Sequence, residues 1–244
     1  SQSQCECTSG NLGTNLVSNA SFNSITQPTW TVTTPTAPAW LTVPPLVPNR
    51  FTIASNPVTW NGNWCGVDHT TGSGNMLLVD PKQNSTTAAW GQNVGSVSPN
   101  TMYIFSVWIN NLVCTINFQD PVIQLRVNGT NVGTSLSLIE GDWVQLCGTW
   151  VSPAVPPATT TIEIIQTLST SATGKDFAVD DVSFAACLAP PITPNAGIDD
   201  TICTGYATQL NGSATGTGPF TYSWAPATGL SCINCQNPTA SPLT

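Results

Sequence analysis

Charged side chains are scarce in this sequence. Lys and Arg number 4 and Asp and Glu 12 among 244 residues, so 7% of the chain is charged, whereas a soluble domain is typically about 25% charged. The shortage of basic residues excludes a basic patch for a nucleic-acid backbone or an anionic membrane. It also leaves no cluster of ionisable groups for tuned acid–base catalysis. We therefore expect neither a nucleic-acid partner nor an enzyme.

Helix signals and long apolar runs are missing as well. No stretch of a dozen residues repeats apolar side chains at i, i+3, i+4 and i+7, and 20 Pro and 19 Gly interrupt the chain. The sequence contains no signal peptide and no run of about 20 apolar residues. We expect no membrane insertion, and a chain that begins at a mature N-terminus or inside a longer protein.

Cysteine, in contrast, is abundant, with 9 residues against a single histidine, His69. This combination favours disulfides formed in an oxidising, extracellular environment over a zinc site. Cys5-x-Cys7 is too tight for half of a usual zinc site, and no second pair follows Cys232-x-x-Cys235 at zinc-ribbon spacing. His69 itself lies in a Gly-rich loop beside Asp68 without a nucleophile nearby, so we interpret it as a hydrogen-bonded loop histidine.

Strand signals are frequent between residues 101 and 184. Thr101–Ile109 alternates, with apolar side chains on both faces, as in a central strand of a sandwich. Val122–Val127 runs into Asn128-Gly129, a strong hairpin signal. Further strands are predicted at Trp143–Val151, Thr160–Thr167 and Phe177–Phe184. This spacing predicts an all-β fold, a two-sheet antiparallel β-sandwich.

A proline-rich stretch divides the chain. Leu188–Ala196 carries three prolines in nine residues and is predicted to be a semi-rigid linker. The residues after it, 197–244, are rich in Gly and Thr, but about fifty residues are too few for a complete immunoglobulin-like sandwich of about 100. The predicted organisation is an N-terminal segment (1–10), a first domain (11–187), the linker (188–196) and an incomplete second domain (197–244).

The segment from Pro35 to Trp64 shows little periodicity and is predicted to be a long, functional loop. Its indoles, Trp40, Trp60 and Trp64, have apolar faces that match the C–H face of a sugar ring, and Asn61 and Asn63 could bond sugar hydroxyls. The alternative is that these indoles pin the loop to the sandwich, with help from Cys65.

Two disulfide hypotheses follow from the positions of the cysteines. Because the termini of such a domain lie side by side, Cys5 or Cys7 is expected to pair with Cys187. Cys114 with Cys147 would staple two core strands. Six cysteines allow fifteen arrangements, so the sequence leaves the choice open.

Four phrases of the first domain carry a resemblance to a known group of proteins: NLVSNASFN (15–23), DHTTGSGNMLLVD (68–80), AWGQNVGSVSPNTMYIFSVW (89–108) and DFAVDDVSF (176–184). In order and spacing they resemble the jelly-roll, carbohydrate-binding-module-like domains of large secreted surface proteins in Bacteroidetes. NAGIDDTIC, FTYSWAPATGL and SCINCQNPTASP in residues 195–244 are similar to the PKD-like, immunoglobulin-type repeats of the same proteins.

The resemblance implies several properties of particular residues. In such jelly rolls a structural Ca²⁺ is commonly held by hard oxygen ligands. Here these would be Asp180 or Asp181 with Asn23, where the family often has Glu. The resemblance also implies a Cys232–Cys235 disulfide and a partner for Cys203 beyond Thr244. Asp200-Thr201-Ile202 resembles an O-glycosylation acceptor of these exported proteins, with Thr201 as the modified residue.

Three functional hypotheses remain. The first is a non-enzymatic surface module of a larger secreted adhesin or filament protein. That protein would be exported by type IX secretion and would support attachment or gliding motility, and the module would bind a glycan or a partner surface. The second is a structural subunit that polymerises when a neighbouring chain adds a strand to the incomplete second domain. The third is a glycan-binding appendage of a polysaccharide hydrolase whose catalytic domain lies elsewhere. Neighbouring repeat domains or like subunits would be partners in the first two.

Overall fold

The computed structural model describes residues 5–7, 10–24, 39–81, 88–114, 120–138, 141–167, 175–216 and 218–242, with the backbone alone at 39–40. The chain divides into two compact units. Unit 1 comprises residues 1–7 and 12–187, and unit 2 comprises residues 8–11 and 188–244. Within the described residues no helix is long and apolar enough to span a bilayer.

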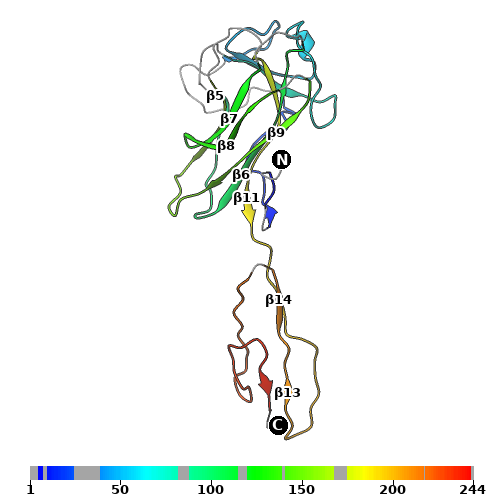
Figure 1. Ribbon diagram of the computed structural model, residues 1–244, viewed down its shortest axis with the longest axis vertical. Helices are drawn as coiled ribbons and strands as arrows, with labels where there is room; N and C mark the ends of the chain where they lie inside the picture. The colour runs from blue at the N-terminus through cyan, green and yellow to red at the C-terminus, as the bar shows by residue number, and fades with distance from the viewer. Residues whose placement is uncertain are drawn as a thin grey trace. The chain divides into compact units, whose positions relative to one another are not determined.

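Unit 1 is built on two sheets (Figure 1). The larger sheet has the strand order β2 (Ala39–Trp40), β3 (Arg50–Ala54), β4 (Met76–Asp80), β11 (Phe177–Leu188), β6 (Met102–Asn111) and β9 (Val144–Val151), and β1 (Asn11–Leu12) also pairs with β11. The smaller sheet has the order β5 (Ala88–Val94), β10 (Thr160–Gln166), β7 (Val122–Val127) and β8 (Thr130–Ser137). Along these two orders neighbouring strands are antiparallel except β2 and β3, which are parallel.

The main core lies between the two sheets. Alternate residues of the central strand β6, among them Phe105 and Val107, meet Ile162 and Ile164 of β10 in one apolar cluster. These side chains are fully buried. This confirms the predicted all-β antiparallel sandwich, because the period-2 pattern of each strand directs one face into the shared core.

The predicted strands and hairpin are present with small shifts at their ends. Asn128 and Gly129 connect β7 to β8 and have φ angles of 47° and 78°. Two successive positive φ angles are those of a type I′ turn, in which the Asn-Gly pair is favoured.

The structure corrects the predicted long loop, and the predicted linker also contains a short strand. The segment from Pro35 to Trp64 contains strand β3, whose Phe51 and Ile53 enter the core, and the 3₁₀ turn η1 (Pro57–Thr59). Five residues bounded by loops give too short an alternation for the sequence to show it. The predicted linker contains β12 (Thr193–Asn195), because an edge strand tolerates a proline such as Pro194.

Unit 2 has two small sheets of its own. β12 pairs with β14 (Ser213–Thr215), and β13 (Thr208–Gln209) pairs with β15 (Thr239–Ala240). The described part of unit 2 has no hydrophobic side chain in either buried apolar cluster.

Candidate functional site

The predicted sugar platform of the long loop is wrong. Trp64 is 2% exposed and Trp60 9% exposed, in a second apolar cluster with Met76 and Leu78 on the outer face of the larger sheet. This burial agrees with the alternative, in which the indoles pack the loop against the larger sheet. An enclosed indole presents no face to a sugar. The side chain of Trp40 lies outside the described residues.

The two asparagines of that platform shape the loop. The side-chain oxygen of Asn61 accepts a hydrogen bond from the backbone N–H of Asn63 at 3.1 Å. The carbonyl of Asn61 accepts from the N–H of Trp64 at 2.9 Å. Asn61 is half-buried and Asn63 exposed. Because Trp60 and Trp64 are buried, neither presents an aromatic face beside these amides.

The disulfides are Cys5–Cys147, Cys7–Cys187, Cys65–Cys114 and Cys232–Cys235. Cys7–Cys187 and Cys232–Cys235 are pairings expected above, whereas the Cys114–Cys147 pairing is wrong. Cys114 follows β6 beside the long loop, where its N–H donates to the carbonyl of Asn63, so Cys65 is its neighbour. Cys147 lies in β9, where the N-terminal segment meets it through Cys5. Cys203 is free and exposed.

The carboxylates expected to hold calcium bind protein donors. Asp180 is fully buried, and its two oxygens accept the backbone N–H groups of His69 at 3.0 Å and of Asp181 at 2.9 Å. Burial raises the pKa of Asp180 to about 6 although these hydrogen bonds oppose the shift. Asn23 is exposed. The described residues contain no group of three or more His, Cys, Asp or Glu suited to a metal ion, and calcium stays a prediction.

Asp181 is directed toward the loop by an irregularity in β11. The pairing of β11 with β6 shifts register between Asp180 and Ser183, and Asp181 has a φ of 46°. Such a bulge reorients a side chain relative to the regular alternation. As a result Asp181 binds the Nδ1 of His69 at 2.8 Å and the hydroxyl of Thr70, which donates at 2.8 Å.

The loop that carries His69 is organised by Asp68. This carboxylate is 4% exposed and accepts the backbone N–H groups of Thr71 at 2.8 Å and of Gly74 at 2.5 Å. Burial opposes its ionisation, but these hydrogen bonds outweigh burial and hold the pKa of Asp68 below its usual value. A charged Asp68 therefore fixes the turn that presents His69 and Thr70.

His69 lies between two indoles. Its ring stacks on Trp108 with centroids 3.8 Å apart and an interplanar angle of 17°. Trp143 meets it edge-on at 5.8 Å, and the Trp143 Nε1 donates to the carbonyl of Val67 at 2.9 Å. Trp108 and Trp143 are half-buried, and the side chains of His69 and Asp181 are each 27% exposed. We call His69, Thr70, Trp108, Trp143 and Asp181 the His69 cluster.

The side chains of the His69 cluster make it a candidate binding surface. It combines partly exposed aromatic rings with a carboxylate and a hydroxyl that can bond a ligand. A Ser–His–Asp-type site needs its nucleophile on the imidazole, whereas the Thr70 hydroxyl donates to Asp181 instead. The sequence does not reveal the cluster, because Trp108 and Trp143 lie in predicted strands more than 30 positions from His69.

The outer face of the smaller sheet is polar. Arg126 and Glu163 approach to 3.5 Å, and the Thr161 hydroxyl donates to the side chain of Asn93 at 2.8 Å. The aromatic residue of β5, Trp90, belongs to the main core instead. Without a described aromatic ring on it, this face offers less of a stacking surface than the His69 cluster.

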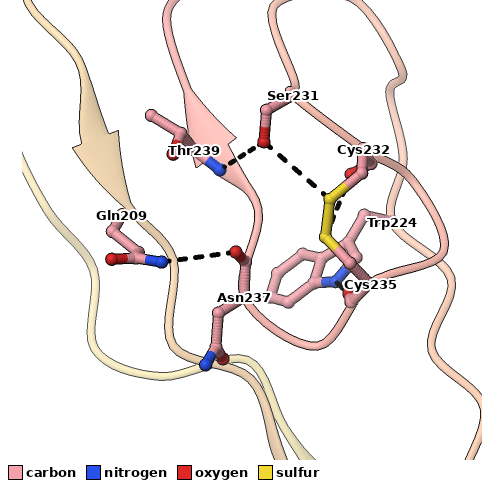
Figure 2. Close-up of a disulfide and its surroundings, with 7 residues drawn as sticks. All are labelled: Gln209, Trp224, Ser231, Cys232, Cys235, Asn237 and Thr239. Atoms are coloured by element: carbon pink, nitrogen blue, oxygen red, sulfur yellow. Dashed lines mark hydrogen bonds between the residues drawn. A yellow bond between two sulfur atoms is a disulfide. The ribbon is translucent and has the colours of Figure 1, made fainter.

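Unit 2 contains a groove of about 380 Å³. One wall carries residues of the β12–β14 pair, among them Pro194 and Ala214, and the other carries Phe220, Tyr222 and Trp224. The three aromatic residues are half-buried, and Thr221 and Ser223 between them are exposed. Figure 2 shows Trp224 beside the Cys232–Cys235 disulfide, where its Nε1 donates to the carbonyl of Cys235 at 2.9 Å.

Comparisons with known proteins give structural likenesses only. No family model matches the chain, and no curated protein matches it significantly. The tandem CBM22-1–CBM22-2 domain of Paenibacillus barcinonensis Xyn10C is 14% identical over 75% of this chain and 47% of its own, with a TM-score of 0.45. A putative sugar-binding protein from Bacteroides thetaiotaomicron is 11% identical over 71% of this chain and 100% of its own, with a TM-score of 0.39.

A structure described as "CBM4 structure and function" is 15% identical over 69% of this chain and 98% of its own, with a TM-score of 0.39. Identities and TM-scores this low do not assign a family or a ligand. Four disulfides in the described residues nevertheless indicate a protein that folds in an oxidising environment.

Proposed function

We propose that unit 1 is a non-catalytic, extracellular module that binds an uncharged glycan through the His69 cluster. The observation that carries this proposal is the group of partly exposed rings, Trp108 stacked on His69 and Trp143 edge-on to it, beside the Asp181 carboxylate. Aromatic faces pack on sugar C–H groups, and the carboxylate and hydroxyl bond sugar hydroxyls. Because the chain has only 4 basic residues and the cluster carries a carboxylate, an acidic glycan is disfavoured.

Affinity electrophoresis of the whole chain on a panel of neutral polysaccharides tests this proposal. We expect retardation by at least one polysaccharide, and loss of the retardation in Trp108→Ala and in Trp143→Ala. Trp224→Ala, which alters a half-buried indole of unit 2, is the matched control and should bind as the wild type does. Equal binding by all four proteins, or no binding to any neutral glycan, would overturn the proposal.

The proposed cellular location and parent protein are based on the resemblance of the sequence to secreted surface proteins of Bacteroidetes. We propose that the module is part of a larger adhesin that type IX secretion exports to the bacterial cell surface. The alternative is that the module is a glycan-binding appendage of a polysaccharide hydrolase. Thr201 is exposed, with its N–H bonded to Asp200 at 2.9 Å, and is accessible to O-glycosylation. Intact-mass measurement of native protein and of a Thr201→Ala variant would detect the loss of a sugar mass at this residue.

A second candidate function is assembly through unit 2. The observation that favours assembly is the groove, whose aromatic side chains are half-buried and belong to neither buried apolar cluster. An extended strand of a neighbouring copy, apolar at alternate positions, would bury these rings and pair with an edge of the two-stranded β12–β14 sheet. Light scattering after size-exclusion chromatography should show mass rising with concentration, and Tyr222→Asp should abolish the rise. A constant monomer mass at all concentrations would exclude this candidate.

A further inference from the structure

A buried amide next to the His69 cluster lacks a hydrogen-bond partner. Asn110 of β6 is 3% exposed, and its side-chain oxygen Oδ1 accepts no hydrogen bond from the described residues. Burying a polar atom without a partner costs free energy, so nearly all such atoms in folded proteins are bonded. The exception at Asn110 calls for a partner that the chain itself does not supply.

Asn110 lies on the outer face of the larger sheet, between the two indoles of the cluster. It is two residues from Trp108 on the same strand, and strand alternation directs both side chains to one face. Its pairing partner on β11, Ala178, belongs to the second apolar cluster, which identifies this face as the outer one. Pairing of β6 with β9 extends to Val144, so the residue before it, Trp143, lies beside Asn110. A ligand on the two indoles would therefore lie next to this amide.

Gly66 leaves room beside the amide. A Cβ added to Gly66 would lie 3.9 Å from the Nδ2 of Asn110, and no other described atom outside residues 65–67 lies within 4 Å of that position. Gly66 is exposed and has a φ of 113°, which glycine adopts without strain. Because no side chain fills this position, a small polar group of a ligand can approach the amide there.

The next residue shows what a structural asparagine looks like in this strand. Asn111 is 2% exposed, almost the same as Asn110. Its Nδ2 donates to Asp120 at 3.2 Å, and its Oδ1 accepts the N–H of Val113 at 3.1 Å. Two adjacent asparagines of equal burial therefore differ, because one is bonded within the fold and the other keeps its oxygen unpaired.

We propose that Asn110 is a ligand-binding residue of the His69 cluster, and that its amide bonds a hydroxyl group of the sugar that packs on Trp108 and Trp143. The inference rests on the proposed glycan binding and deepens it. A hydroxyl is both a donor and an acceptor, so it can satisfy the Oδ1 as well as the Nδ2 of this amide. The ligand is thus a neutral sugar with a free hydroxyl at the position that reaches Asn110.

A ligand-binding role and a structural role predict opposite effects on stability. Asn110→Leu removes an unpaired polar group and places a side chain of similar volume near the apolar side chains of Leu112 and Ala178. The unliganded protein should therefore become more stable. Asn111→Leu breaks two hydrogen bonds and leaves the buried N–H of Val113 unpaired, so this variant should be less stable.

Affinity electrophoresis and thermal unfolding of the whole chain test the inference. The probes are three neutral polysaccharides, a glucan, a xylan and a mannan. For a polysaccharide that retards the wild type, Asn110→Leu should raise the dissociation constant by about tenfold, which corresponds to one hydrogen bond. Its unfolding temperature should rise by about 2–4 °C. Asn111→Leu is the matched control, which should bind as the wild type does and unfold at a lower temperature.

Equal binding by the wild type and Asn110→Leu would overturn the inference and leave the proposed function intact. Weaker binding with an unchanged or lower unfolding temperature would also overturn the inference, because a structural residue gives that result. If the wild type binds none of the three polysaccharides, the proposed function fails and the inference fails with it. If Asn110→Leu does not fold, the side-chain amide NMR signals of Asn110 in the wild type decide. A chemical-shift change on addition of the bound polysaccharide supports the inference, and unchanged signals overturn it.

Discussion

The two units of this chain stabilise β structure by different means. Unit 1 closes two sheets over fully buried side chains such as Phe105 and Ile164. Unit 2 has strands of two or three residues and contributes no residue to the buried apolar clusters of the described chain. It relies on the Cys232–Cys235 disulfide and on hydrogen bonds such as that from Trp224 to Cys235. Substitutions of the same kind should therefore have unequal effects in the two units.

The largest difference is expected from the disulfides. Cys7–Cys187 spans 180 residues, and Cys232–Cys235 spans 3. Because a cross-link restricts the unfolded chain more when its loop is longer, a Cys7→Ser, Cys187→Ser double variant should lower the free energy of unfolding by about 4–5 kcal/mol. The Cys232→Ser, Cys235→Ser pair should lower it by about 2 kcal/mol. Urea unfolding measures both, and equal losses would contradict the comparison.

Phenylalanine truncations should differ nearly as much. Phe105 is fully buried in the main core, whereas Phe220 is half-buried at the groove of unit 2. Phe105→Ala should destabilise unit 1 by about 3–5 kcal/mol, since it removes apolar contacts and leaves a cavity. Phe220→Ala should cost about 1 kcal/mol or less. Calorimetry would show whether each variant moves a separate transition, and a larger loss for Phe220→Ala would reverse our view of unit 2.

A smaller contrast is expected at two glycines with positive φ. Gly133 has a φ of 69°, and an added Cβ would overlap the carbonyl oxygen of Cys147. Gly205 has a φ of 86° with no atom near an added Cβ. Gly133→Ala should cost about 3 kcal/mol through strain and steric overlap, and Gly205→Ala about 1 kcal/mol through strain alone. Thermal unfolding of the two variants distinguishes these costs. Similar decreases in the unfolding temperature of Gly133→Ala and Gly205→Ala would argue against a close approach of β8 to β9.

The smallest effect concerns two indole hydrogen bonds. Trp143 donates to Val67 in unit 1, and Trp224 donates to Cys235 in unit 2, both at 2.9 Å. Replacing either residue by Phe removes about 1 kcal/mol of hydrogen bonding. Exchange of the neighbouring amides should increase more around Trp224, because no buried cluster holds its surroundings. The reverse result would indicate that unit 2 is the more rigid part.

The sequence was most informative where one strand carries its own pattern. The alternation of Thr101–Ile109 and the Asn128-Gly129 turn each predicted an element that the structure contains, because strand pleat and turn geometry are local properties. The pattern does not reveal the short strand β3, and it leaves open whether Trp60 and Trp64 form a sugar-binding surface or pack the loop against the sandwich, where the structure buries them. Neither residue carries a local sign of whether its indole faces solvent or a second apolar cluster.

By itself, the sequence determined that this chain is all-β, poor in charge and cross-linked by cysteines, because composition and period-2 alternation are properties of short segments. Only the tertiary structure decided that Cys114 joins Cys65, that His69 stacks on Trp108, and that Asp181 bonds the His69 ring. Each of these pairs unites residues from different strands or loops. Their contact depends on sheet order and register, which arise when separate strands close over a common core.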